Sequence, residues 1–253
     1  MKRIGVVGGA AWPSTLEYYR LICAWSNAHF AALGHGAPLP TPPMTIESLV
    51  VAETRKLRGV PGDEASWAGF DAVIRGALLR LQAAGCDFAV IANNTFHTRL
   101  HALREGLEME ILSILDVVAD ATKSTGADRA LVLGTSVTMQ SDAYATALAA
   151  RGIEANARLP ERVIADMQRL IDEEFHGEAA TAAGRAALLA KCRDLTDAPE
   201  RTAILLACTE LPLAFPGNTD DPIFECEGFT FVNTSAAHAR AALKQSLGTT
   251  LRI

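Results

Sequence analysis

Residues 203–210 read Ala-Ile-Leu-Leu-Ala-Cys-Thr-Glu, so that five apolar residues are followed by a thiol, a hydroxyl and a carboxylate. A short apolar run of this length is typical of a strand that is buried on both faces of a parallel sheet. The polar residues would then lie where the buried strand meets a loop. The stretch therefore predicts a strand over 203–207, with Cys208 at its carboxyl end.

The same arrangement, an apolar run that ends in small or polar residues, occurs at 6–9, 90–95 and 133–135. In open parallel sheets, ligands bind outside the carboxyl ends of the strands. We therefore expect the four clusters to border one ligand-binding crevice.

Short apolar and β-branched runs alternate with longer helical patterns along the whole chain, which is typical of an α/β fold with parallel sheets. The expected strands are 3–7, 44–50, 88–92, 111–115, 130–133, 152–157, 203–207 and 229–232. The clearest expected helices are 14–28, 70–84 and 162–174, and the expected loops include 37–43 and 59–62.

Composition narrows the function classes. The 253 residues carry a net charge of −6 without any basic block, so we expect no nucleic-acid partner. The apolar runs are strand-sized, so we expect no membrane span. Five cysteines without a CxxC pair argue against a disulfide framework and a structural zinc site. With no visible secretory signal, the expected location is cytoplasmic.

Cys208 is the candidate reactive residue. A thiol at the start of a helix would have a lowered pKa and would serve as a base or nucleophile. Free cysteine is also a common buried apolar residue, and this inert interpretation stays open.

Three further clusters are candidates. Gly9, with Ser14 and Thr15 at the next helix start, could approach an anion, or could form only a capped turn. The amide and hydroxyl groups of 93–95 could bind a carboxylate, or could cap a turn. His97 either reacts or orients a neighbour, and His238 is either a site residue or a surface histidine.

Together, and in this order, the clusters resemble the aspartate/glutamate racemase family over nearly the whole chain. The similar stretches are Gly8-Gly9-Ala10-Ala11-Trp12-Pro13-Ser14-Thr15 with Tyr18-Tyr19-Arg20, Asn94-Thr95-x-His97, Gly134-Thr135 with Thr138-Met139 and Tyr144, and Cys208-Thr209-Glu210.

The resemblance implies two similar α/β lobes, each a small parallel sheet flanked by helices, with the active site in the cleft between them. The first lobe would contain 1–112 plus 220–253, and the second 113–219. It also implies proton transfer at the α-carbon of an amino acid, no metal or other cofactor, and a homodimer. One cysteine from each lobe would face the α-carbon, because racemisation moves a proton from one face to the other.

The implied site residues follow from the matching motifs. Cys208 and the residue at position 93 would be catalytic. Ser14, Thr15, Asn94, Thr95, Thr135 and Thr209 would bind substrate. Gly9, His97, Glu210 and His238 would support the site.

The chain departs from the family pattern at two positions. Asn93 stands where the family has its first-lobe cysteine, and an amide does not exchange protons near neutral pH as a thiol does. A bound water or His97 would have to replace that thiol. Asn233 stands where the family more often has aspartate.

Three functions therefore stay open. The first is an amino-acid racemase or epimerase of aspartate/glutamate type, with Cys208 as principal acid/base. The second is a one-cysteine decarboxylase or isomerase of the same superfamily, which needs a proton on one face only. The third is a catalytically degenerate paralogue that binds an acidic ligand.

Overall fold

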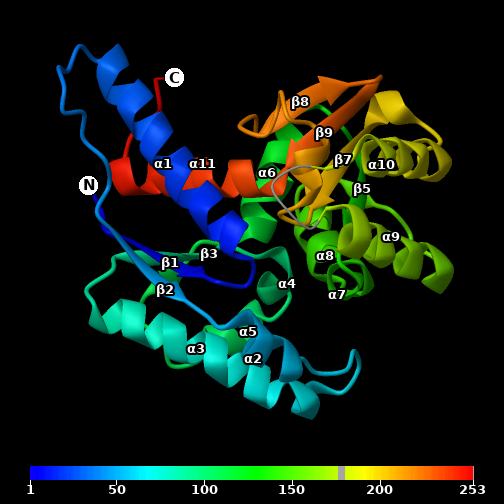
Figure 1. Ribbon diagram of the computed structural model, residues 1–253, viewed down its shortest axis with the longest axis horizontal. Helices are drawn as coiled ribbons and strands as arrows, with labels where there is room; N and C mark the ends of the chain where they lie inside the picture. The colour runs from blue at the N-terminus through cyan, green and yellow to red at the C-terminus, as the bar shows by residue number, and fades with distance from the viewer. Residues whose placement is uncertain (176–179, 253) are drawn as a thin grey trace. The chain divides into compact units, whose positions relative to one another are not determined.

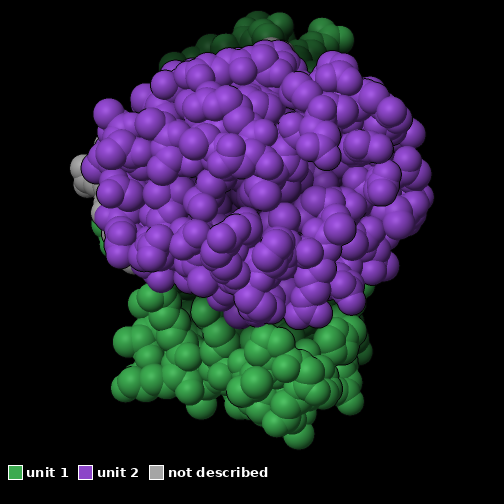
Figure 2. All heavy atoms as spheres, turned by 90° about the vertical axis from the view of Figure 1, so that its right-hand side faces the viewer, with its two compact units in different colours: residues 1–113, 238–253 green, residues 114–237 purple. Residues whose placement is uncertain are grey.

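The computed structural model describes residues 1–175 and 180–252, and these form two compact units. The first contains residues 1–113 and 238–253, and the second contains 114–237 (Figure 2). The first unit is thus built from two separate stretches of chain.

The first unit is built on a four-stranded parallel sheet of order β2-β1-β3-β4. Its strands are β1 (Ile4–Gly8), β2 (Met44–Ser48), β3 (Phe88–Ile91) and β4 (Glu110–Ile111). Every residue of β1 and β3 is buried, as expected for central strands that are covered on both faces.

Helices cover both faces of this sheet. The long helix α1 (Trp12–Ala32) lies on one face together with the part of α11 (Thr234–Leu247) from His238 onward, and α3 (Ala68–Ala83) covers the other face (Figure 1). Shorter helical segments complete the unit: α2 (Val51–Lys56), a 3-10 turn (Glu64–Trp67), α4 (Asn94–His97) and α5 (Leu100–Leu103).

The second unit has a five-stranded sheet of order β6-β5-β7-β9-β8, in which only the β8–β9 pair is antiparallel. Its strands are β5 (Arg129–Gly134), β6 (Glu154–Ala155), β7 (Thr202–Ala207), β8 (Ile223–Cys226) and β9 (Phe229–Asn233). Its helices are α6 (Ile114–Ser124), α7 (Ser136–Gln140), α8 (Ala143–Ala149), α9 (Glu161–Glu174) and α10 (Ala182–Leu195), with 3-10 turns at Pro199–Arg201 and Leu211–Ala214.

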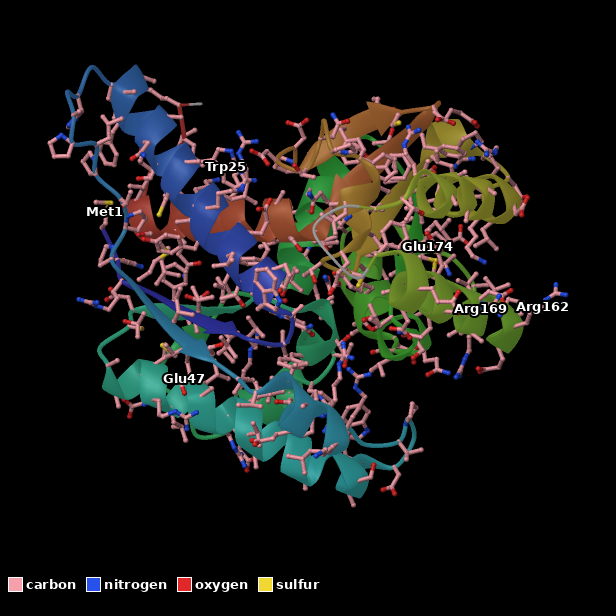
Figure 3. The ribbon with its side chains drawn as sticks, in the orientation of Figure 1. Met1, Trp25, Glu47, Arg162, Arg169 and Glu174 are labelled. Carbon is pink, nitrogen blue, oxygen red and sulfur yellow. The ribbon has the colours of Figure 1, made fainter. Side chains whose placement is uncertain are left out.

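Helix α9 shows how the apolar pattern becomes packing. Met167, Leu170 and Ile171 follow helical spacing and are buried in the core of the second unit, whereas Arg162 and Arg169 are exposed and lie on the outer side (Figure 3). The same core contains a group of phenylalanines around β9, in which Phe215 and Phe231 have ring centroids 4.7 Å apart. Burial of this stripe is what holds the helix on its sheet.

Most expected elements are confirmed, with three differences. The strand expected over 111–115 ends at Ile111, because Ile114 and Leu115 already belong to the amphipathic helix α6. The strand expected over 152–157 contains only Glu154–Ala155. Strand β8 was missed, because exposed Glu225 interrupts its short apolar run.

The unit boundaries differ at one end from those that the resemblance implies. The first division, between 113 and 114, lies one residue from the expected position. The second lies at 237/238 rather than at 220, because β9 pairs with β7 and β8 pairs with β9. Residues 223–233 therefore complete the second sheet.

In the described ranges, none of the helices combines the length and the apolar character that crossing a membrane requires.

Gly9 allows the chain to turn sharply after β1. Its φ is +79°, and a β-carbon placed on it would lie 2.2 Å from the Leu49 carbonyl oxygen. Gly34 has a similar φ of +84°, but a β-carbon there would meet nothing within 4 Å. Gly9 is therefore required both for its φ and for close backbone approach.

We expect Gly9→Ala to lower the free energy of unfolding by about 3 kcal/mol, because it combines left-handed strain with a backbone clash. The matched variant Gly34→Ala carries only the strain and should lose about 1 kcal/mol. Urea unfolding of both variants measures the difference. Equal losses would show that the approach to Leu49 is not a constraint.

Candidate functional site

Cys208 lies directly after β7 and is 5% exposed. Its thiol donates a hydrogen bond to Oε2 of Glu210 at 2.9 Å, and the Thr209 hydroxyl donates to the same oxygen at 2.8 Å. The three residues of the motif therefore form one cluster, in which a single carboxylate oxygen accepts two hydrogen bonds.

This cluster keeps the thiol protonated. Burial raises the pKa of Cys208 well above its usual value, and the negative charge and accepting oxygen of Glu210 raise it further, with a smaller contribution from Asp172. The expectation of a lowered pKa at a helix start is wrong. The helix that follows is only a four-residue 3-10 turn, Leu211–Ala214, and the neighbouring carboxylate has the opposite effect. At neutral pH the Cys208 thiol is therefore protonated and donates its hydrogen bond to the Glu210 carboxylate.

Thr135 ends the strand next to β7. It caps α7, its Oγ1 accepts from the Thr138 amide at 3.4 Å, and the two threonine hydroxyls are 3.0 Å apart. Because Gly134 is paired with Ala207 in register, Thr135 and Cys208 lie at the carboxyl ends of adjacent strands. Adjacent strands are roughly 4.8 Å apart, so the two residues border the same edge of the sheet.

A buried tyrosine, to which the sequence assigned no role, supports this edge. Tyr144 is 1% exposed and hydrogen-bonded to Thr234, whose hydroxyl donates to the Leu206 carbonyl at 2.8 Å. Burial raises the pKa of the Tyr144 hydroxyl, which therefore stays protonated. The GT-x-x-TM…Y motif includes this tyrosine, and its burial indicates that it supports the structure.

In the first unit, Asn93 serves as a helix cap. It lies at the start of α4, is half-buried, and its Oδ1 accepts from the Phe96 amide at 3.0 Å. Of the two interpretations of the 93–95 cluster, capping is therefore the one that applies to Asn93. Asn94 and Thr95 follow inside the four-residue helix and are 2% and 3% exposed.

The hydroxyls after β1 are also engaged with the backbone. Thr15 Oγ1 accepts from the Gly9 amide at 2.9 Å, and Ser14 Oγ lies 2.7 Å from the Ala11 carbonyl and 3.1 Å from the Ala92 carbonyl. These contacts join the turn after β1, the start of α1 and the end of β3. Gly9, Ser14, Thr15 and the segment 93–97 thus lie at one edge of the first sheet.

Both candidate histidines are buried and neutral. His238 Nε2 donates to the Leu112 carbonyl at 3.1 Å, so its Nδ1 is the acceptor for the Tyr18 hydroxyl at 2.8 Å. His97 Nε2 donates to the Ile91 carbonyl at 3.2 Å, and the two imidazole centroids are 5.2 Å apart. The surface interpretation of His238 is wrong, since it is 0% exposed.

Burial depresses the pKa of both rings. For His238 it lowers the pKa to about 4, and for His97 burial and the nearby His238 lower it well below 6.5. Each imidazole supports the structure around it, and His97 holds the end of β3 beside Asn93.

Asn233 occupies a position that requires an amide. Its Oδ1 accepts from the Ala236 amide at 3.1 Å, and its Nδ2 donates to the Thr219 carbonyl at 2.8 Å. An ionised aspartate would keep the first bond and lose the second, because a carboxylate has no donor. The departure from aspartate is therefore explained within the second unit.

Within residues 1–175 and 180–252, no group of three or more His, Cys, Asp or Glu side chains is placed to hold a metal ion.

The free energy of unfolding should decrease as the pH is lowered through the range in which the buried His238 stays neutral. The unfolded ring titrates near 6.5 and the folded ring at about 4, so the unfolded state binds more protons between these values. The stabilisation is present above pH 6.5 and is lost as the pH falls towards 4, by on the order of 3 kcal/mol.

Urea unfolding across this pH range checks the prediction. His238→Gln should make the pH dependence shallower, although His97 retains a contribution of the same sign. His35→Gln removes an exposed imidazole and is the matched control. An unchanged slope in His238→Gln would contradict the assignment.

Asn233→Asp should lower the free energy of unfolding by about 1–2 kcal/mol at neutral pH. Without the amide donor, the Thr219 carbonyl faces a carboxylate, and this contact is unfavourable. The negative charge of the new aspartate at the start of α11 is favourable and offsets this loss only in part. The deficit relative to the wild type should shrink on acidification, since a protonated carboxyl donates again. Asn233→Ser, which keeps an acceptor but lacks the amide donor, should show a deficit that does not shrink in this way.

Comparison with known proteins agrees with this architecture. The chain is similar to a putative Asp/Glu racemase from Yersinia pestis, with a TM-score of 0.77 and 25% identity over 98% of this chain and 100% of that one. It is similar to an aspartate racemase homologue from Pyrococcus horikoshii OT3 (TM-score 0.72, 23% identity, 98% and 100% covered). It is also similar to the Picrophilus torridus aspartate racemase (TM-score 0.71, 20% identity, 100% and 96% covered).

The family model described as Asp/Glu/Hydantoin racemase matches residues 7–242, and this range contains all the motifs discussed above. The resemblance seen in the sequence is confirmed, together with the two α/β units. The chain belongs to the Asp/Glu/Hydantoin racemase family.

Proposed function

We propose that the protein is an amino-acid racemase or epimerase of aspartate/glutamate type that works without a cofactor and uses Cys208 as principal acid/base. The observation that carries the proposal is the 2.9 Å hydrogen bond from the Cys208 thiol to Glu210 in a chain of this family. Membership of the family supports a small amino acid as substrate.

The Cys208–Glu210 pair supplies both directions of proton transfer. As an acid, the thiol gives its proton to the α-carbanion, and the thiolate forms. As a base, the thiol first passes its proton to Glu210, and the thiolate then takes the α-proton. Burial makes the thiolate strongly basic, which suits the removal of a weakly acidic proton next to a carboxylate.

Polar groups near the two strand edges would hold the substrate. In this proposal Asn94, Thr95 and Thr209 bind the α-carboxylate through neutral hydrogen bonds, and Ser14, Thr15 and Thr135 support the same task. Asn93 contributes a hydrogen bond and no proton, which follows from its amide chemistry.

A second candidate reaction is favoured by the position of Asn93. Its side-chain oxygen caps α4, so this position offers no acid/base group that matches Cys208. A single thiol suits protonation on one face only, as in decarboxylation of a disubstituted malonate followed by protonation of the resulting carbanion. The polar groups at 93–95 would then stabilise the carbanion.

The racemase proposal predicts loss of the α-proton NMR signal when L- or D-aspartate or glutamate is incubated with the protein in heavy water. Cys208→Ala should slow this exchange by about 100-fold or more, the usual contribution of a general acid/base. Cys192→Ala is the matched control, because Cys192 is also buried in the second unit, on α10, and among the residues that the structure describes no carboxylate is hydrogen-bonded to it.

The outcomes separate the candidates. Exchange with inversion supports the racemase, and exchange with retention supports a one-faced catalyst. Carbon dioxide release from a malonate panel without exchange of amino acids supports the decarboxylase. Tight ligand binding without any turnover supports the degenerate paralogue. Wild-type exchange in Cys208→Ala would remove Cys208 from the reaction.

A further inference from the structure

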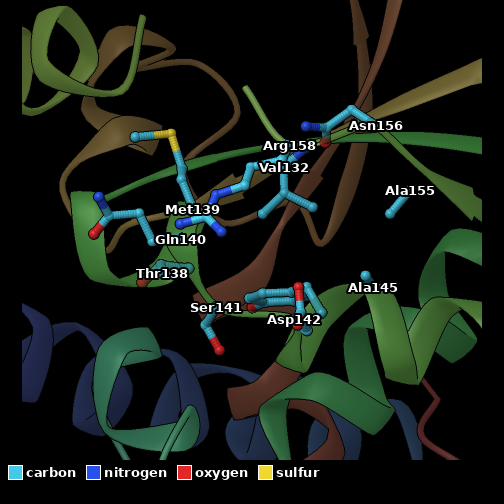
Figure 4. A pocket seen from close by; sticks show the side chains of 11 residues that line it. Val132, Thr138, Met139, Gln140, Ser141, Asp142, Ala145, Ala155, Asn156 and Arg158 are labelled. Carbon is cyan, nitrogen blue, oxygen red and sulfur yellow. Dashed lines mark hydrogen bonds between the residues drawn. The ribbon is translucent and has the colours of Figure 1, made fainter. Parts of the chain in front are cut away.

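A small pocket lies in the second unit beside Thr138 and Tyr144, and the charged residues that line it have no role assigned so far. It is bordered by the α7–α8 junction and by the segment after β6, and its volume is about 60 Å³ (Figure 4). Val132, Met139, Ala145 and Ala155 form the apolar part of its lining. The pocket therefore borders the edge strand of the second sheet.

Two opposite charges line the pocket without neutralising each other. Arg158 reaches across it towards Met139 and Gln140, and Asp142 lies on another wall (Figure 4). Both side chains are exposed. The nitrogen atoms of the Arg158 guanidinium lie more than 4.0 Å from the Asp142 carboxylate oxygens, so the two residues form no ion pair. Over the described ranges, neither charged group makes a hydrogen bond or ion pair. Each is therefore available to a ligand.

This lack of pairing is unusual in the unit. Six of its eight arginines pair with a carboxylate, and Arg158 and Arg162 are the exceptions among the residues that the structure describes. Arg162 is on α9, points outward into solvent, and does not line the pocket (Figure 3). Arg158 therefore combines an unpaired guanidinium with a walled cavity.

The neutral polar groups of the wall are already engaged. Asn156 Oδ1 accepts from the Val132 amide at 2.9 Å, and its Nδ2 donates to the Ala157 carbonyl at 3.0 Å. Gln140 donates to Glu161 at 3.3 Å. These bonds fix the wall, so the charges that remain for a ligand are one guanidinium and one carboxylate.

We propose that this pocket binds the zwitterionic head group of a small amino acid. The Arg158 guanidinium would bind its carboxylate, and the Asp142 carboxylate would bind its ammonium. A water molecule occupies roughly 30 Å³, so the cavity holds a group of a few heavy atoms, and a larger side chain would extend outward. Asp142 disfavours a second negative charge near Arg158, so dianions are selected against.

Calorimetric titration with glycine and with L-alanine tests the proposal, with acetate and methylammonium as probes that carry only one of the two charges. The amino acids should bind saturably, and each single-charge probe at least about tenfold more weakly, since each forms one of two charge-assisted contacts. Arg158→Gln and Asp142→Asn should each weaken amino-acid binding by a similar factor. Arg162→Gln should bind as the wild type does.

Exchange kinetics show whether the pocket is separate from the reaction. None of the residues proposed to bind the reacting substrate lines the pocket. Arg158→Gln should therefore weaken alanine binding and leave KM and kcat for α-proton exchange unchanged. A raised KM for exchange in Arg158→Gln would contradict a separate site.

Other results would overturn it. Unchanged binding in both Arg158→Gln and Asp142→Asn, acetate binding as tightly as alanine, or no saturable binding in the millimolar range would each exclude a zwitterion site. The binding readout does not depend on Cys208, so failure here and failure of the proposed reaction are distinguishable.

Discussion

The hydrogen bond from the His238 imidazole to the Leu112 carbonyl is the contact on which the first unit depends. The chain leaves this unit after Ser113 and returns to it at His238, so this 3.1 Å bond joins the two stretches of a discontinuous unit at the point where the chain returns. The opposite ring nitrogen accepts from Tyr18 on α1, and the ring is fully buried. Loss of either partner would leave a buried polar atom unsatisfied, at roughly 1–3 kcal/mol.

Helix α11 is anchored separately in each unit. Its first turn belongs to the second unit, where Asn233 bonds the Thr219 carbonyl and Thr234 bonds the Leu206 carbonyl on β7. From His238 onward it packs in the first unit. One continuous helix thus carries the polar anchors of both units, and its anchor on β7 is two residues before Cys208.

The environment of Cys208 has a direct consequence for its chemistry. Burial and the Glu210 carboxylate both raise the pKa of the thiol, so the proton is held at the end of β7 until a stronger base is formed nearby. A developing carbanion next to a carboxylate is such a base. The raised pKa therefore favours a proton donor with a carboxylate partner over a permanently ionised nucleophile.

The amino-acid sequence determined most of the strands, the polar residues at their carboxyl ends and the family, because these depend on local periodicity and on motifs of a few adjacent residues. Tertiary structure alone decided which way the pKa of Cys208 moves, because burial raises it and the loop after β7 also directs Glu210 back onto the thiol. It also decided that His97 and His238 are neutral, that β8 completes the second sheet and that Arg158 and Asp142 share one pocket. The burial of polar side chains and the convergence of residues far apart in the chain cause these properties, and both depend on contacts that form only in the folded chain.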